Sequence, residues 1–549
     1  MAPPRRGVVA SLVLMLVACA PRAAPVTPAA GDPMPSCREA WVDIPSALRN
    51  YDFARDAMPT ERGNEGYRSY AEHLGRRACQ KEWTVLLYMA ADAEDLRPHA
   101  YWQIHEIESA LTAGGGSAGS TVDADIVAQL DLDIPDGVRR LHLFGGITPG
   151  EPERPPPSSF ATQTPRGIRS PVVEFVNEEG GPPGEIFERF LRWGIEAYPA
   201  RHYWVIVWGH GRGWRPRVTG AGTPLPYDRD IRTSGLAQDF GQGTVLDVPS
   251  LREALQRAAG AGLGGRPFDV FAADACLMQS VEVAAELAGV ARYAVGSEQI
   301  ESYLGLPYRE LLPHLNGMSP PPPGEGCAPR DAGCALARFV PDEELRSVAP
   351  GGPYAAVAPN AGEHLTASTL DLDRVTIELL PALRRLSAAL AAWIDEEPLR
   401  RVTLADVLVP PRGPGLGATL RTPDFQGGMR DIGVLLSRLR ATLVDETRST
   451  TGRPTPPARA LDTAISEAQD ALRHSVPASA FGTRYQEMEY AMIAGVSVWV
   501  PATPEEYRAR VDFFSPARIY AEPAADRRAV EQGWRTWIDR VFGGDAAHP

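Results

Sequence analysis

The stretch YWVIVWGHGRGW, residues 203–214, decides the fold of this 549-residue chain. Its first six residues are all β-branched or aromatic, which is typical of a strand buried on both faces of a parallel sheet. The stretch FDVFAADACLM, residues 268–278, repeats the pattern of a short apolar strand that runs into polar residues. Because sites in open parallel sheets form at the carboxyl ends of the strands, His210 and Cys276 are candidates for one crevice.

Alternating strands and helices surround these two stretches. Three more apolar runs predict strands, at residues 83–89, 126–130 and 293–297. Helical patterns separate the strands, at residues 96–111, 185–197, 248–259 and 277–288. This alternation predicts an α/β fold, a three-layer α/β/α sandwich with a mostly parallel sheet.

The second half of the chain is more helical. Residues 371–397 and 430–473 carry long amphipathic patterns, which predict helices that pack beside the sheet. Residues 491–500 (AMIAGVSVWV) predict one more strand, which we expect to return to the core sheet. We therefore expect an α/β core at residues 81–315 and a helical region at residues 316–549. Long loops rich in proline and glycine interrupt both, at residues 145–171, 212–244, 317–334 and 410–428.

The N-terminus predicts export. Two arginines precede an apolar run that ends in LVAC, residues 16–19, and this run is too short to span a bilayer. Residues 1–18 therefore resemble the signal peptide of a bacterial lipoprotein, and Cys19 would carry the lipid that anchors the protein to the membrane of the cell envelope. An ordinary signal peptide with an incidental cysteine is the alternative. Residues 19–80 would form a tether and an N-terminal segment.

The other five cysteines suggest two disulfides and one thiol. In an oxidising compartment, four of them could pair: Cys37, Cys79, Cys327 and Cys334. Cys276 then remains as a candidate reactive thiol, although unpaired cysteines are often buried as small core residues.

Composition and short motifs exclude several functions. The formal charge of −14, from 55 basic and 69 acidic residues, argues against nucleic-acid binding. GGSAG at residues 115–119 matches a serine-hydrolase pattern but precedes a strand, and Gly260, Gly262 and Gly265 fail as a dinucleotide motif for the same reason. His105 has no second histidine four residues later, so that no metal site is predicted.

The residues after the two strands suit nucleophilic catalysis. A thiolate is a strong nucleophile, and we expect the dipole of the helix after Cys276 to favour the anion. The imidazole of His210 can protonate the departing amine and then activate water. The backbone N–H groups of Gly211 and Cys276 could hold the oxyanion.

Several blocks of the sequence together resemble the clostripain family of cysteine peptidases. The blocks are residues 83–89, His210-Gly211-x-Gly213-Trp214, Asp274–Met278 with Glu282, Ser297-Glu298 and residues 495–501. The resemblance implies a caspase–gingipain-like fold. It also implies an endopeptidase that cleaves peptide bonds through a thioacyl-enzyme, with Cys276 and His210 as its dyad. A non-catalytic lipoprotein that uses this fold as a binding or structural module of the cell envelope is the alternative.

Specificity and activation have two interpretations each. In the family, the acid at the position of Asp274 helps to bind a basic side chain before the scissile bond, whereas its alternative role is to cap the following helix. Leu304 stands where the family has a second acid, so that an apolar pocket is also possible. The segment 212–244 is either a processing loop or a surface insertion. The resemblance suggests calcium as an activating ion, as in some members of the family. No Asp-rich loop of EF-hand spacing is present in the sequence, and no cofactor is assigned.

Overall fold

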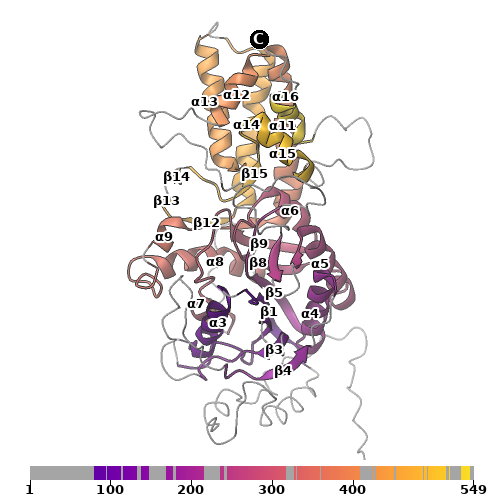
Figure 1. Cartoon of the computed structure of the whole chain (residues 1–549), viewed down its shortest axis with the longest axis vertical. Helices are drawn as coiled ribbons and strands as arrows, with labels where there is room; N and C mark the ends of the chain where they lie inside the picture. The colour runs from indigo at the N-terminus through magenta and orange to yellow at the C-terminus, as the bar shows by residue number, and fades with distance from the viewer. Residues whose placement is uncertain are drawn as a thin grey trace, which may run out of the picture.

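A computed structural model of the whole chain gives the fold (Figure 1). It describes residues 37, 79–93, 95–112, 115–132, 138–147, 168–176, 181–214, 235–239, 244–316, 327–328, 331–358, 360–408, 425, 428–449, 453–485, 488–490, 492–514, 519 and 533–543. The predicted signal peptide, Cys19 and most of the 19–80 segment lie outside these residues. In the described part, no helix is long and apolar enough to cross a membrane.

A nine-stranded sheet of described strands forms the centre, in the order β12-β10-β9-β8-β5-β1-β2-β3-β4. Its strands are β1 (Lys81–Ala90), β2 (Ala124–Asp131), β3 (Val138–His142), β4 (Val172–Val176), β5 (Ala200–Trp208), β8 (Phe268–Asp274), β9 (Ala291–Ser297), β10 (Thr366–Asp371) and β12 (Ala478–Phe481). The five central strands, β9-β8-β5-β1-β2, are parallel, and antiparallel strands extend the sheet at both edges. The prediction of a mostly parallel α/β sheet is confirmed.

Helices cover both faces of this sheet. One face packs against α4 (Pro183–Ala197), α5 (Val248–Gly262) and α6 (Val281–Leu287), and the other against α3 (Arg97–Ser109), α7 (Tyr308–Leu311) and α8 (Ala332–Val348). Successive residues of a strand point to opposite faces, so that Val205 and Val207 enter the first core while Trp204 and Ile206 enter the second. The three predicted layers are therefore present.

The C-terminal half adds a helical region, in the upper part of Figure 1. Its helices are α11 (Leu380–Glu396), α12 (Arg400–Leu408), α13 (Ile432–Ser449), α14 (Pro456–Ser475), α15 (Pro504–Phe514) and α16 (Arg535–Phe542). The predicted pattern at 430–473 is thus two helices, and tryptophans such as Trp393 and Trp537 fill the core between the helices. The remaining described elements are β6 (Leu236–Asp239), β7 (Thr244–Leu246), η2 (Leu312–Leu315), α9 (Ala361–His364), α10 (Leu372–Arg374), η3 (Val375–Leu379), β11 (Met429–Asp431), β13 (Arg484–Tyr485), β14 (Met488–Glu489) and β15 (Ser497–Trp499).

The predicted strand at 491–500 does not join the core sheet. Only β15 forms there, and it pairs with β11 in a separate two-stranded sheet. The place beside β9 is already taken by β10, and the N–H groups of Ser497 and Trp499 instead donate to the Gln279 carbonyl and the Glu282 carboxylate. Because β10 and β12 complete the sheet, the core is not confined to residues 81–315.

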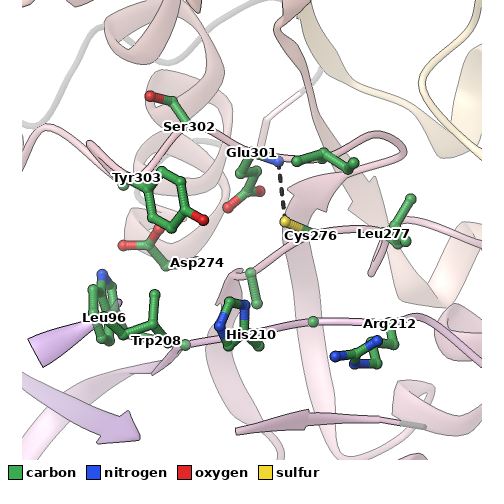
Figure 2. Close-up of a pocket in the computed structure, with 15 residues that line it drawn as sticks. Leu96, Trp208, His210, Arg212, Asp274, Cys276, Leu277, Glu301, Ser302 and Tyr303 are labelled. Carbon is green, nitrogen blue, oxygen red and sulfur yellow. Dashed lines mark hydrogen bonds between the residues drawn. The ribbon is translucent and has the colours of Figure 1, made fainter. Parts of the chain in front are cut away.

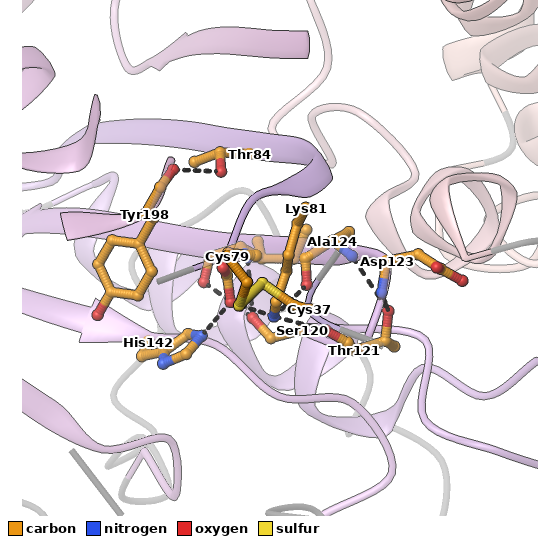
Figure 3. Close-up of polar contacts among 12 residues, drawn as sticks. Cys37, Cys79, Lys81, Thr84, Ser120, Thr121, Asp123, Ala124, His142 and Tyr198 are labelled. Atoms are coloured by element: carbon orange, nitrogen blue, oxygen red, sulfur yellow. Dashed lines mark hydrogen bonds and ion pairs between the residues drawn. A yellow bond between two sulfur atoms is a disulfide. The ribbon is translucent and has the colours of Figure 1, made fainter. Parts of the chain in front are cut away.

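At the amino ends of the parallel strands, the described residues form a closed network of polar contacts (Figure 3). The buried Lys81 Nζ lies 2.6 Å from Asp125 Oδ1, and His142 Nε2 lies 3.0 Å from the same oxygen. A disulfide between Cys37 and Cys79 adjoins this network, and a second joins Cys327 to Cys334. The four cysteines are those that the sequence suggested for disulfides, and both bonds fit an oxidising compartment.

Candidate active site

The topology brings the two candidate residues to one edge of the sheet. Strands β5 and β8 are parallel neighbours, with Trp208 opposite Asp274. His210 and Cys276 follow these partners by two residues each. The loops that carry them are in backbone contact, because a Cβ atom placed on Gly211 would overlap the Cys276 carbonyl oxygen and lie 2.8 Å from the Cys276 nitrogen. Only glycine permits this approach.

A pocket of about 240 Å³ opens at this edge and is lined by both candidates (Figure 2). Its other lining residues are Leu96, Trp208, Gly209, Gly211, Arg212, Asp274, Ala275, Leu277, Ile300, Glu301, Ser302, Tyr303 and Gly305. They come from the ends of β5 and β8, from the loop after β1 and from residues 300–305, which follow β9. The site is therefore built by loops on a rigid sheet.

Cys276 does not lie at a helix N-terminus, contrary to our expectation. Helix α6 begins only at Val281, and Ser280 is its cap. Between strand and helix, the chain makes a turn in which Leu277 has a φ of 64°. The sequence 277–288 is helix-compatible, but the N–H groups of Leu277 and Gln279 donate to the carbonyls of Gln299 and Ser297, and these bonds hold the turn instead. No helix dipole therefore acts directly on the thiol.

The surroundings of Cys276 favour the neutral thiol. Burial raises the pKa of Cys276 to about 12, and the neighbouring Glu301 carboxyl adds to this effect. The N–H of Glu301 donates to Sγ at 3.3 Å, which acts in the opposite direction (Figure 2). Since the thiolate is the nucleophile, the site requires a base that removes the proton.

His210 is held by an aspartate that the sequence did not reveal. Its Nε2 lies 3.2 Å from Asp95 Oδ2, in the loop between β1 and α3. The hydrogen bond with His210 holds the pKa of Asp95 below its usual value, although partial burial opposes it. Tyr303 also hydrogen-bonds Asp95, and His99 stacks on the Tyr303 ring with centroids 4.9 Å apart. Asp95 stands more than 100 residues before His210, and no local spacing connects the two.

Asp274 lines the pocket and does not cap α6. Its Oδ2 accepts hydrogen bonds from the Leu306 N–H at 3.1 Å and from the Tyr308 hydroxyl at 2.8 Å. Burial raises the pKa of Asp274 to about 6, against the effect of these two donors. Of the two roles that the sequence left open, the pocket role agrees with this geometry.

A second acid of the pocket, Glu301, was also missed. Burial raises its pKa well above the usual value, and the nearby carboxyls of Asp274 and Glu344 raise it further. Leu304, the residue that replaces the family acid, packs instead with Trp102 and Tyr354 in a small buried cluster. Its carbonyl accepts a hydrogen bond from Gln103.

The serine-hydrolase-like and dinucleotide-like motifs of the sequence lie in ordinary secondary structure, and the described residues show no metal site. Gly260 and Gly262 lie inside α5, and Ser117 pairs with Leu111 in a short bridge. Among the described residues, no group of three or more histidine, cysteine, aspartate or glutamate side chains is arranged to hold a metal ion. Calcium therefore stays unassigned.

Part of the chain is similar to known proteins. Residues 182–321 match the model of the Clostripain family. No curated protein matches the chain in sequence. Among solved structures, a secreted C11 cysteine protease from Bacteroides thetaiotaomicron is 14% identical with a TM-score of 0.47, over 76% of this chain and 93% of that chain. An inactive zymogen C11 protease from Parabacteroides distasonis is 16% identical, also with a TM-score of 0.47, over 79% of this chain and 97% of that chain. The similarity to the Clostripain family therefore covers residues 182–321, which contain both His210 and Cys276.

Proposed function

We propose that this chain is a cysteine endopeptidase in which Cys276 is the nucleophile and His210 is the general acid and base. The observation that carries the proposal is the presence of both side chains in one pocket, on loops that touch through Gly211 and Cys276. The family match covers the same residues.

The acylation step begins with the neutral thiol. His210 accepts the Sγ proton while the sulfur attacks the carbonyl carbon of the scissile peptide bond. Because Asp95 engages Nε2, the proton transfer falls to Nδ1. The protonated His210 then donates this proton to the amine nitrogen, the C–N bond breaks, and an acyl group remains on Cys276 as a thioester.

Deacylation uses the same groups. His210 removes a proton from water, and the hydroxide oxygen attacks the thioester carbonyl. The C–S bond breaks, the carboxylic acid leaves, and the proton returns to Sγ. Asp95 is a positioning residue in both steps, because its carboxylate fixes the ring and stabilises the imidazolium that forms.

The oxyanion of each tetrahedral intermediate needs N–H donors that are not already engaged. In the bridge between Gly211 and Leu236, the Arg212 N–H donates to the Gly235 carbonyl and the Ala237 N–H donates to the His210 carbonyl. The bridge therefore does not engage the Gly211 N–H. The Cys276 N–H lies next to Gly211. These two groups are the proposed oxyanion donors.

For specificity, we propose that Asp274 binds the side chain of Arg or Lys before the scissile bond. A buried carboxyl in a pocket beside the nucleophile suits a guanidinium or an ammonium group. We further propose that the chain is exported and that lipid on Cys19 anchors it to the cell envelope. A Cys19→Ser variant should then lose incorporation of labelled palmitate and should leave the membrane fraction.

Labelling of the active site tests the catalytic proposal. An acyloxymethyl ketone probe with arginine next to its reactive group should modify Cys276 in the purified protein, both as the intact chain and after limited cleavage. Labelling should disappear in Cys276→Ser, and peptide hydrolysis in His210→Ala should fall by about 10³-fold or more. Folded protein that stays unlabelled in both forms would favour the non-catalytic scaffold.

A further inference from the structure

We infer that Glu301 is the second carboxyl of the specificity pocket, and that Asp274 and Glu301 together bind the cationic side chain before the scissile bond. This inference deepens the proposed function and rests on it for the identity of the substrate.

The position of Glu301 is fixed relative to the nucleophile. Its N–H donates to Cys276 Sγ at 3.3 Å, and its carboxyl accepts from the Ala275 N–H, so that both ends of the residue are held against the Cys276 loop. Figure 2 shows the carboxyls of Glu301 and Asp274 on the same side of Cys276, and Arg212 on the other side. A side chain in this half of the pocket would meet both acids.

The two acids share an environment without compensating charge. Within the described part of the chain, carboxyls and hydrogen-bond donors shift the pKa values of Asp274 and Glu301, but no lysine, arginine or histidine does. A third buried carboxyl, Glu344, lies close by, and burial and Asp274 raise its pKa to about 8. Buried carboxyls are ordinarily paired with a cation, and here the cavity leaves space for one from outside.

Asp274 has an oxygen left for such a cation. Leu306 and Tyr308 both donate to Oδ2, and no hydrogen bond to Oδ1 is found among the described residues. Gly305 keeps this side open, because a Cβ atom there would lie 2.9 Å from the Asp274 oxygens. The φ of Gly305 is 60°, a conformation that also favours glycine.

Leu304, in the same loop as Glu301, does not line the pocket. The Leu304 side chain is 5% exposed and fills the apolar cluster around Tyr354. A carboxyl at that position would be buried beside the Glu106 carboxyl, which already accepts the Tyr354 hydroxyl. Glu301, three residues earlier in the same loop, instead lines the pocket.

The test compares a charged substrate with its neutral isostere. Peptides with arginine or citrulline before the scissile bond differ in charge and hardly in shape. Glu301→Gln should lower kcat/KM for the arginine peptide by about tenfold and should leave the citrulline peptide unchanged, because glutamine still accepts the Ala275 N–H. In the parent protein, KM for the arginine peptide should fall as pH rises and the acids ionise, and this dependence should weaken in Glu301→Gln. An equal loss on both peptides, or no loss, would overturn the inference.

A matched variant and a binding assay separate this inference from the catalytic proposal. Glu310 is also a partly buried acid, and its pKa is raised to about 7, but it does not line the pocket. Glu310→Gln should therefore leave kcat/KM unchanged for both peptides. Agmatine, a small guanidinium compound, should bind the Cys276→Ala protein about tenfold more weakly when Glu301→Gln is added. If Glu301→Gln weakens agmatine binding but the parent protein hydrolyses no peptide, the peptidase proposal is refuted and the cation-binding pocket stands. If Glu301→Gln leaves agmatine binding unchanged, only the role of Glu301 in the pocket is refuted.

Discussion

Two aspartates on strand β8 show how differently the two ends of the parallel strands are built. Asp269, near the amino end, and Asp274, at the carboxyl end, are 2% and 4% exposed. Burial would raise both pKa values, but at Asp269 the His202 hydrogen bond and charge, the Tyr203 N–H and the Arg266 charge together outweigh it, and the pKa lies below the usual value. At Asp274 no cation of the described residues lowers the pKa, which rises to about 6.

This contrast indicates at which end of the parallel strands the buried carboxyls are already paired with cations of the protein. Asp269 also accepts from the Tyr203 N–H at 3.0 Å and from Arg266 at 3.1 Å, and at the same end of the strands the buried Asp125 is likewise paired with Lys81. At the carboxyl end, burial raises the pKa values of Asp274, Glu301 and the Cys276 thiol, and no cation of the described residues lowers the pKa of either carboxyl. Local imbalance of this kind is expected where a site is built to receive a ligand.

The largest effect should come from breaking the amino-end network at Lys81. Lys81→Met removes the cation 2.6 Å from the buried Asp125 and should lower the free energy of unfolding by about 3–5 kcal/mol. Urea denaturation measures the loss. The double variant Lys81→Met/Asp125→Asn removes the stranded charge and should recover part of it; a double variant as unstable as the sum of the singles would show that the pair is not coupled.

Next in size is the loss of close backbone contact at the carboxyl end. Gly211→Ala places a methyl group against the Cys276 backbone and the Ala275 Cβ, 2.9 Å away, and should shift the two loops apart. Displacing the dyad in this way should lower kcat/KM by about 100-fold. Gly260→Ala is the control, because a Cβ atom at Gly260 has no neighbour within 4 Å, and activity there should not change.

A smaller effect is expected for Asp269→Asn, which keeps the shape but removes the charge. The variant should lose about 2 kcal/mol of stability at pH 7, because His202 and Arg266 lose a charged acceptor. The pKa of Asp269 is depressed in the folded protein, so its stabilising contribution is present above the unfolded value and is lost as pH falls through the folded value. Chemical denaturation at pH 7 and pH 3 should show the gap closing; an equal gap at both values would contradict the assignment.

The sequence predicts the parts of this molecule that depend on local pattern. Buried parallel strands have a composition of their own, and for that reason β5 and β8, with the edge they share, could be located from the order of residues alone. The strand at 491–500 was placed wrongly, because an apolar run gives no information on which partner it pairs with, and β10 already occupies the place beside β9.

The site was predictable only where residues act in short blocks. His210, Cys276, Gly211 and Asp274 follow strands directly, so that their position is determined by the sheet. Asp95 and Glu301 reach the pocket from loops after β1 and β9, and their roles depend on tertiary contacts. The helix expected directly after Cys276 is absent for a related reason, since the N–H groups of Leu277 and Gln279 pair with carbonyls at the end of β9 and in the loop that follows it.

The smallest effect is expected for Asp274→Asn, and it contrasts most with Asp269→Asn because the substitution should stabilise the protein at high pH instead of destabilising it. Asp274→Asn keeps an acceptor for Leu306 and Tyr308 but removes an acid whose pKa is raised from 3.8 to about 6. The raised pKa stabilises the parent only at low pH, and this stabilisation is lost as pH rises through about 6. At pH 8 the variant should therefore be more stable than the parent by about 1 kcal/mol, less than the full shift implies because burial of the asparagine amide also costs desolvation. Urea denaturation at pH 4 and pH 8 checks the sign. If Asp274→Asn were destabilising at pH 8, as Asp269→Asn should be, then the carboxyl end would be charge-balanced like the amino end, and a cationic ligand would have no reason to bind there.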